Sequence, residues 1–305
     1  MTNLDLIIVG SIGIDAIETP FAKRTDLLGG SATYACAAAS FFASTGMVGI
    51  VGDDFPEDFL ARYRRFGIDL SGLQQVAGPT FRWDGVYADD FINRETRRTE
   101  LGVFADFHPE LPERYRDAPY VLLGNIHPTL QLRVLDQIRR PKLVAADTMD
   151  LWIRTTRDAL LEVLARVDLL LLNDAEARQL SGRYGLIDCA EALLAMGPKH
   201  VIIKKGEHGA MLFSGSDLTL VPAFPVRDLR DPTGAGDTFA GALLGHVAGQ
   251  GGQDYAALRR ALPHASVVAA FGVEAFSLER LESLTQAQIL DRLHRLREMI
   301  ACPEA

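Results

Sequence analysis

Residues 231–241 read Asp-Pro-Thr-Gly-Ala-Gly-Asp-Thr-Phe-Ala-Gly, and the rest of the chain is best understood from this stretch. Gly234, Ala235 and Gly236 allow a tight turn with uncovered N–H groups, and the small and apolar residues after them predict a packed helix. Such a helix start binds phosphate, because free N–H groups and the positive end of the helix dipole coincide there. Asp237 in the first turn is placed to accept a proton from an attacking hydroxyl group, although an acid there also simply compensates the dipole.

The composition indicates a soluble globular protein. Of the 305 residues, 48% are hydrophobic and 23% are charged, and the net charge of −9 argues against a nucleic-acid or anionic-membrane surface. No apolar run is long enough to span a bilayer, and no basic region precedes the first apolar segment. Cys36, Cys189 and Cys302 lack the spacing of metal ligands, as is typical of reduced thiols in the cytosol. We therefore expect a cytoplasmic protein with no nucleic-acid or membrane partner.

Short apolar runs alternate with helical stretches along most of the chain. The expected strands are residues 4–9, 48–51, 120–126, 142–147, 167–172 and 200–204. The expected helices are residues 32–43, 56–66, 128–139, 155–166, 175–196, 255–271 and 276–301. This alternation predicts an α/β fold, a doubly wound and mainly parallel sheet with helices on both faces. Ligands of such sheets bind at the carboxyl ends of the strands.

A different pattern occupies residues 80–103, where side chains alternate with period two. Phe81, Trp83 and Tyr87 fall on one face, so the region predicts strands with one wetter side. We interpret it as a small β-sheet lid joined by residues 14–28. An edge hairpin of the main sheet is the alternative.

Two further motifs follow expected strands. Asn173 and Glu176 have the spacing of a helix capping box. Lys204 and Lys205 precede a turn that contains Gly206 and Gly209. The chain has no G-x-x-x-x-G-K-[ST], H-R-D or D-F-G string, which excludes P-loop kinases and protein kinases. The absence of G-x-G-x-x-G disfavours a nicotinamide oxidoreductase.

The string at residues 231–241 resembles the signature of the ribokinase-like (PfkB) family of sugar and nucleoside kinases, and the other motifs follow in family order. The resemblance implies one ribokinase-like domain over residues 1–305, with the lid formed by about 14–28 and 79–104. It also implies transfer of the γ-phosphoryl group of ATP to a hydroxymethyl group of a sugar-like acceptor. Asp237 would be the general base and the turn from Gly234 to Gly236 the anion hole. A nucleoside kinase is the alternative, and a non-catalytic sugar or nucleotide sensor on the same scaffold is the rival from another class.

The resemblance also assigns roles to individual residues. It places Asp15, Gly29 and Gly30 against the hydroxyl groups of the acceptor, with Tyr34 where the family often has Asn. On the nucleotide side it names Asn173, Glu176, Lys205, Gly206, Gly209 and Ser266. Glu176 would order the water shell of a magnesium ion, Ser266 stands where an Asn often contacts adenine, and either lysine before the turn is able to pair with a phosphate. Asp231 is a candidate for ordering a monovalent cation such as K⁺. We thus expect ATP and Mg²⁺ as cofactors, and a homodimer through the lid is one assembly that the family uses.

Overall fold

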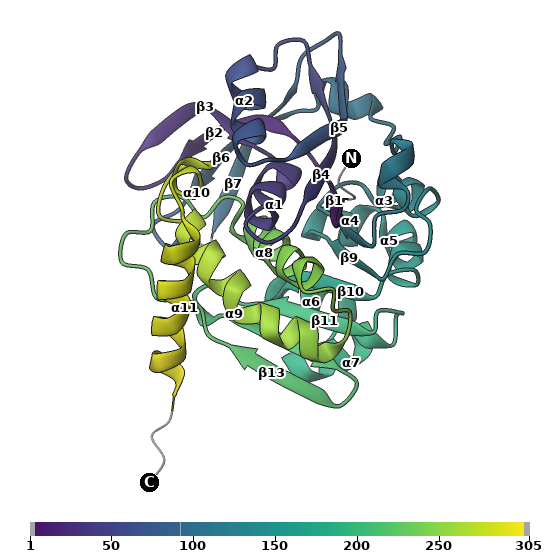
Figure 1. The fold of residues 1–305 in the computed structure, drawn as a ribbon, viewed down its shortest axis with the longest axis vertical. Coiled ribbons are helices and arrows are strands. Elements are labelled where there is room, and N and C mark those ends of the chain that lie inside the picture. The colour runs from purple at the N-terminus through teal and green to yellow at the C-terminus, as the bar shows by residue number, and fades with distance from the viewer. Residues whose placement is uncertain (1–3, 92, 302–305) are drawn as a thin grey trace.

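The computed structural model describes residues 4–91 and 93–301, and its centre is a nine-stranded β-sheet (Figure 1). In chain order the strands are β1 (Leu6–Val9), β4 (Thr45–Gly52), β5 (Asp69–Val76), β8 (Tyr120–Leu123), β9 (Leu143–Asp147), β10 (Leu169–Asn173), β11 (His200–Lys204), β12 (Ala210–Ser214) and β13 (Asp217–Val221). In space they run β13-β12-β11-β10-β9-β8-β1-β4-β5. The pairs β11–β12 and β12–β13 are antiparallel and the others are parallel, which confirms the predicted α/β sheet.

The central strands are buried on both faces because their sequences are continuously apolar. In β10, Leu169 and Leu171 belong to the hydrophobic core on one side of the sheet. Leu170 and Leu172 belong to the core on the other side, as the alternation of side chains along a strand requires.

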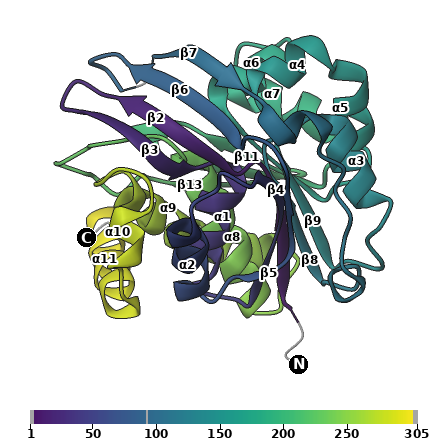
Figure 2. The same ribbon diagram turned by 90° about the horizontal axis from the view of Figure 1, so that it is seen from above.

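Helices cover both faces, and Figure 2 shows the two layers with the sheet between them. One layer contains α1 (Ser31–Ala39), α2 (Glu57–Arg65), α8 (Ala235–Gly249), α9 (Tyr255–Gly272), α10 (Glu279–Glu282) and α11 (Gln286–Ile300). The other contains α3 (Pro128–Leu135), α4 (Asp150–Thr155), α5 (Arg157–Leu164), α6 (Asp174–Ser181) and α7 (Leu186–Leu194). Short 3-10 helices are η1 (Gly102–Asp106), η2 (Glu113–Tyr115) and η3 (Gly206–His208).

Helices α1 and α8 pack backbone against backbone. A Cβ atom on Gly241 would lie 2.0 Å from the carbonyl oxygen of Ala35, so no larger residue fits there. Gly245 meets Ala39 in the same way, at 2.7 Å from its Cα atom. This contact fixes the first turn of α8 beside the first turn of α1, and both turns contain predicted site residues.

A second, four-stranded sheet stands apart from the central one (Figures 1 and 2). Its strands are β2 (Gly13–Glu18), β3 (Lys23–Gly29), β6 (Phe81–Tyr87) and β7 (Arg94–Glu100), in the order β3-β2-β6-β7. The central pair β2–β6 is parallel and the outer pairs are antiparallel. The alternating pattern therefore forms a separate small sheet, and the alternative of an edge hairpin in the main sheet is wrong.

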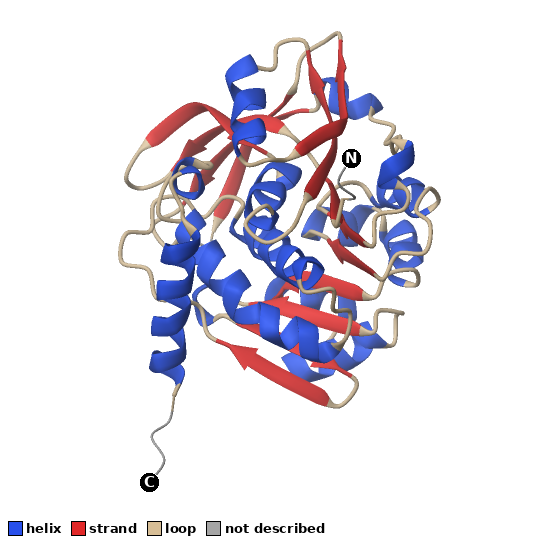
Figure 3. Cartoon of the chain, viewed as in Figure 1, coloured by secondary structure: helices blue, strands red, loops and turns tan. Residues whose placement is uncertain are grey.

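The structure divides two of the expected helices (Figure 3). The helix predicted over residues 175–196 ends at Gly182, which adopts the left-handed conformation with φ 68° and so terminates α6 before α7 begins. The helix predicted over residues 276–301 becomes α10 and α11, because Thr285 forms a capping box that starts α11 afresh.

Among the described residues, none of the helices combines the length and apolar character needed to cross a bilayer. Cys36 and Cys189 are buried free thiols. Cys302 lies outside the described residues.

Candidate active site

The turn before α8 has the geometry of an anion-binding helix start. Gly234 is the N-cap residue of α8 and has φ 74°, which favours glycine. The N–H group of Ala235 donates to the carbonyl oxygen of Pro232 at 3.1 Å, and that of Thr238 closes the first helical turn on Gly234 at 2.8 Å. Of the three residues predicted to form an anion hole, Ala235 therefore already uses its N–H group inside the turn.

Asp237 lies in the first turn of α8 and is half-buried. Burial and the negative charge of Asp147 raise the pKa of Asp237 to about 7, against an opposing influence of Lys204. A carboxyl group with a pKa near neutrality is suited to general-base catalysis, because it is both substantially ionised and sufficiently basic at neutral pH.

Tyr34 of α1 packs directly on the glycine turn. A Cβ atom on Gly234 would lie 2.3 Å from the ring of Tyr34, so the ring occupies the space beside this residue. Tyr34 is buried, and its hydroxyl group has no hydrogen-bond partner among the described residues. Burial and the charge of Asp231 raise the pKa of Tyr34 well above its ordinary value, which keeps the hydroxyl protonated.

Asp15 is a buried carboxyl group with an unused oxygen. Asp15 is 4% exposed, and its Oδ1 atom has no hydrogen-bond partner among residues 4–91 and 93–301. Burial and the negative charge of Asp231 raise the pKa of Asp15 to about 8. Gly29 lies against this carboxyl group, since a Cβ atom there would be 1.9 Å from Oδ2. Gly30, the N-cap residue of α1, follows directly.

A cavity of about 120 Å³ lies beside Asp15, between β2, β3 and β6 of the small sheet. It is lined by Ile14, Asp15, Ala16, Thr25, Asp26, Arg82, Trp83, Asp84 and Arg98. A larger cavity of about 470 Å³ lies against β5 and η1, and none of the predicted site residues lines it. Of these two cavities, the smaller is lined by a predicted site residue, Asp15, together with the aromatic ring of Trp83.

Asp231 holds the backbone of Thr233, the residue that connects the glycine turn to the small sheet. Its carboxylate is almost completely buried and accepts from the N–H groups of Thr233 at 2.9 Å and Ser277 at 3.4 Å. The hydroxyl group of Thr233 donates to that of Tyr87 on β6 at 3.1 Å. Burial raises the pKa of Asp231.

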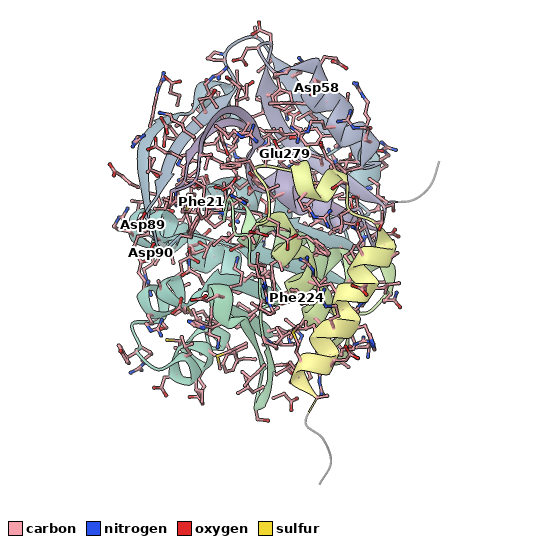
Figure 4. The ribbon with its side chains drawn as sticks, turned by 90° about the vertical axis from the view of Figure 1, so that its left-hand side faces the viewer. Phe21, Asp58, Asp89, Asp90, Phe224 and Glu279 are labelled. Atoms are coloured by element: carbon pink, nitrogen blue, oxygen red, sulfur yellow. The ribbon has the colours of Figure 1, made fainter. Side chains whose placement is uncertain are left out.

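The turns at one end of the small sheet pack on each other and against Arg230, which directly precedes Asp231. Phe21, between β2 and β3, packs on Phe91, between β6 and β7, with ring centroids 5.7 Å apart. The guanidinium group of Arg230 lies 5.2 Å from the centroid of Phe21. Figure 4 shows Phe21 on the same side of the molecule as Asp89 and Asp90 of the β6–β7 turn.

Asn173 and Glu176 form the capping box that their spacing predicts. The Asn173 side chain accepts from the Glu176 N–H at 2.8 Å, and the Glu176 carboxylate accepts from the Asn173 N–H at 2.8 Å. Burial and the charge of Asp147 raise the pKa of Glu176 to about 7. The capping role thus coexists with a position close to the other acidic groups of the site.

Lys204 and Asp147 form an ion pair that the sequence did not reveal. The Nζ atom of Lys204 donates to Oδ2 of Asp147 at 2.6 Å, and both side chains are largely buried. The same Nζ atom lies 3.1 Å from the point where a Cβ atom on Gly236 would stand. The sequence showed two lysines before the turn and either could pair with a phosphate, but only Lys205 was named as a nucleotide residue. The structure brings Lys204 to the glycine turn.

The remaining residues predicted on the nucleotide side are connected through the turn around Gly206 and through Pro222. The N–H group of Lys205 donates to Gly209 O at 2.7 Å, which closes the turn around Gly206. Gly209 lies against Pro222, and Ser266 of α9 donates its hydroxyl group to the carbonyl oxygen of the same Pro222 at 2.8 Å.

Comparisons with known proteins identify the family of the chain. Residues 5–278 match the model of the pfkB family of carbohydrate kinases. The chain is 33% identical over 248 residues to the cytidine kinase of Thermococcus kodakarensis, covering 79% of this chain and 87% of that protein. It is 28% identical to the ribokinase of Bacillus subtilis, covering 88% and 94%. A candidate ribokinase II of E. coli, solved with ATP and Mg²⁺, superposes with a TM-score of 0.78 at 20% identity, covering 96% and 99% of the two chains.

The matched family phosphorylates hydroxyl groups of sugars or nucleosides. Its model spans nearly the whole of the sequence, including the glycine turn and Asp237. The chain is therefore a member of the pfkB family, a sugar or nucleoside kinase.

Proposed function

We propose that this kinase transfers the γ-phosphoryl group of ATP to a hydroxymethyl group, with Asp237 as the general base. The observation that carries the proposal is the position of Asp237 in the first turn of α8, directly after the glycine turn. Its pKa of about 7 supports the same role.

In the proposed step, Asp237 takes the hydroxyl proton while the acceptor oxygen forms a bond to phosphorus. The bond from phosphorus to the bridging oxygen of ATP breaks, and ADP leaves with that electron pair. The N–H groups of Gly234 and Gly236 then stabilise charge on the transferring oxygens. Ala235 contributes only if the bond of its N–H group to Pro232 opens.

The acidic residues fit a magnesium ion that is held mainly by nucleotide and water. Within the described part of the chain, no group of three or more His, Cys, Asp or Glu residues forms a metal cage. Magnesium commonly keeps several waters and uses substrate phosphates as ligands. Glu176, beside Asp147 and Lys204, is the side chain that would orient those waters. When bound, Mg²⁺ would neutralise phosphate charge.

The acceptor is proposed to bind at Asp15, Gly29 and Gly30, beside Tyr34. Asp15 Oδ1 and the Tyr34 hydroxyl are both buried without partners among the described residues, and acceptor hydroxyl groups would supply those partners. A nucleoside is favoured over a free sugar by the 33% identity to a cytidine kinase. Trp83, which lines the adjacent cavity, is suited to stacking on a base.

Two further proposals concern the surroundings of the site. The small sheet is proposed to act as a lid, because Tyr87 ties it to the glycine turn. Asp231 is proposed to order a monovalent cation, because its carboxylate is almost completely buried next to the glycine turn. Replacing KCl by tetramethylammonium chloride in the assay tests the cation directly.

An acceptor panel tests the proposed function. Purified protein with ATP and Mg²⁺ is given ribose, fructose, cytidine, uridine, adenosine or inosine, and both ADP and phosphorylated product are quantified. We expect that one nucleoside is converted to its monophosphate and that ADP is formed from ATP in an equal amount. Product from sugars alone would overturn the nucleoside assignment. Absence of acceptor-dependent ADP release and of ATP binding would overturn the proposed function.

A further inference from the structure

Lys204 is the last residue of β11, and its side chain reaches across the end of the neighbouring strand. Asp147 ends β9, and β10 lies between these two strands. Two strand spacings amount to roughly 10 Å, a distance that the long lysine side chain helps to span. The resulting ion pair measures 2.6 Å and is largely buried, at 16% and 6% side-chain exposure.

The ammonium group also lies close to the glycine turn. A Cβ atom on Gly236 would lie 3.1 Å from Nζ of Lys204, which places the charge beside the first turn of α8. An oxygen that accepts from the Gly236 N–H group would therefore be within reach of the ammonium group after a small side-chain movement. Asp147 holds Lys204 in this place when no such oxygen is present.

The charges around Lys204 are otherwise mostly negative. Asp147, Glu176 and Asp237 all act on it, and although burial disfavours its charged form, their charges raise the pKa of Lys204 above its ordinary value. Lys204 therefore stays protonated at neutral pH. Without it, these carboxylates would oppose the approach of a polyanionic donor. Arg94 of β7 also influences Asp237, but it is an exposed residue of the small sheet.

We propose that Lys204 is a catalytic residue that binds the transferring phosphoryl group and completes the anion hole beside Gly236, with Asp147 as its positioning residue. This inference rests on the proposed function. As the acceptor oxygen bonds to phosphorus and the bond to ADP breaks, Lys204 donates to a phosphoryl oxygen and keeps its proton. The acceptor proton goes to Asp237, as before.

A purely structural ion pair is the competing explanation, because removing one partner of a buried pair costs about 3–5 kcal/mol of stability. Two variants separate the explanations. Lys204→Met removes the cation, and Lys204→Met combined with Asp147→Asn removes the cation without leaving a buried unpaired carboxylate. The matched control is Lys199→Met, because Lys199 lies just before the same strand and pairs with Asp168 at 2.8 Å in an exposed position.

The first readout is nucleotide binding, measured by calorimetry with ADP and with the non-hydrolysable ATP analogue AMP-PNP. Both Lys204 variants should bind AMP-PNP about tenfold more weakly and ADP with wild-type affinity, because only the former carries the group that Lys204 contacts. With the acceptor found in the panel, kcat should fall about 10²-fold. This is the loss expected when one hydrogen-bond donor to the charge that develops in the transition state is removed. Lys199→Met should match wild type in every measurement.

The second readout is the pH profile of kcat/KM. Lys204 lowers the pKa of Asp237, so the acidic limb should move to higher pH in Lys204→Met. Asp147 raises the same pKa, so in a third variant, Asp147→Asn alone, the limb should move to lower pH. A structural pair would change thermal stability and leave the difference in affinity between AMP-PNP and ADP unchanged, and this difference decides between the two explanations.

Failure of the inference is distinguishable from failure of the proposed function. If wild type turns over an acceptor and the double variant retains wild-type kcat and AMP-PNP affinity, Lys204 is not catalytic and only the inference falls. If wild type neither binds AMP-PNP nor phosphorylates any acceptor, the proposed function falls, and the inference with it.

Discussion

At the scale of single residues, the candidate site contains polar groups whose burial lowers the stability of the protein. Asp15 and Tyr34 are buried polar side chains, each with an atom that lacks a partner among the described residues. Such groups destabilise the folded protein unless a ligand satisfies them. The proposed acceptor pocket therefore carries an unfavourable free energy that ligand binding would relieve.

The cost of burying the Asp15 carboxyl group is measurable as a dependence of stability on pH. Its pKa is raised to about 8 in the folded protein from 3.8. The folded state therefore holds a proton that the unfolded state has lost, and the free energy of unfolding falls as pH rises from about 4 through 8. We expect Asp15→Asn to be more stable than wild type by about 1–3 kcal/mol at pH 8.5, with the difference shrinking towards pH 5.

Urea unfolding at both pH values measures this, with Asp89→Asn as the control. Asp89 is an exposed residue of the β6–β7 turn (Figure 4), so its substitution should leave stability within about 0.5 kcal/mol of wild type at either pH. Equal stability of Asp15→Asn and wild type at pH 8.5 would show that the carboxyl group is satisfied in the free protein.

The sequence showed some of these residues and hid others for a physical reason. The glycine turn, Asp237 and the Asn173–Glu176 capping box are local in the chain, so motif and spacing were sufficient to find them. The Lys204–Asp147 pair joins residues 57 positions apart. It depends on the order of β9, β10 and β11 in the sheet, and no local pattern specifies that order.

At the scale of elements, the close contact of α1 and α8 positions the site. Gly241 permits this contact, because a Cβ atom there would lie 2.0 Å from the carbonyl oxygen of Ala35. Continuously apolar strands and their alternation with helices were readable from the sequence. The end of the helix at Gly182 could not be predicted, because the helical pattern of apolar residues continues on both sides of this single glycine.

Gly241→Ala tests the role of this contact. The added methyl group must push the two helices apart, so we expect a loss of about 1–3 kcal/mol in the free energy of unfolding and a lower kcat. The control is Gly185→Ala, where the nearest atom is the flexible carboxylate end of Asp188 at 3.0 Å. Chemical denaturation of both variants gives the comparison, and equal stability would mean that α1 and α8 move apart freely.

At the scale of the whole molecule, the small sheet is joined to the turn before α8 by the hydrogen bond between Thr233 and Tyr87. Its edge strands β3 and β7 carry exposed charged side chains, which oppose pairing with another strand. A homodimer through this sheet stays a prediction that sedimentation velocity tests.

Closure of the small sheet should appear in amide hydrogen exchange. With ATP and acceptor both bound, we expect exchange in β6 and β7 to slow relative to the free protein, because the sheet would close over the ligands. Tyr87→Phe removes one hydrogen bond, worth about 1 kcal/mol, and should reduce this protection about fivefold. Tyr184→Phe is the control, since Tyr184 is 88% exposed. Unchanged exchange in wild type on ligand binding would contradict a lid.

The most direct test of the central claim is the kcat of Asp237→Asn with the acceptor identified by the panel. Asparagine keeps the shape of the side chain but cannot accept the hydroxyl proton as a base. We predict a fall in kcat of about 10²–10⁴-fold, with ATP affinity close to that of wild type. A variant that phosphorylates the acceptor at the wild-type rate would contradict the assignment of Asp237 as the general base.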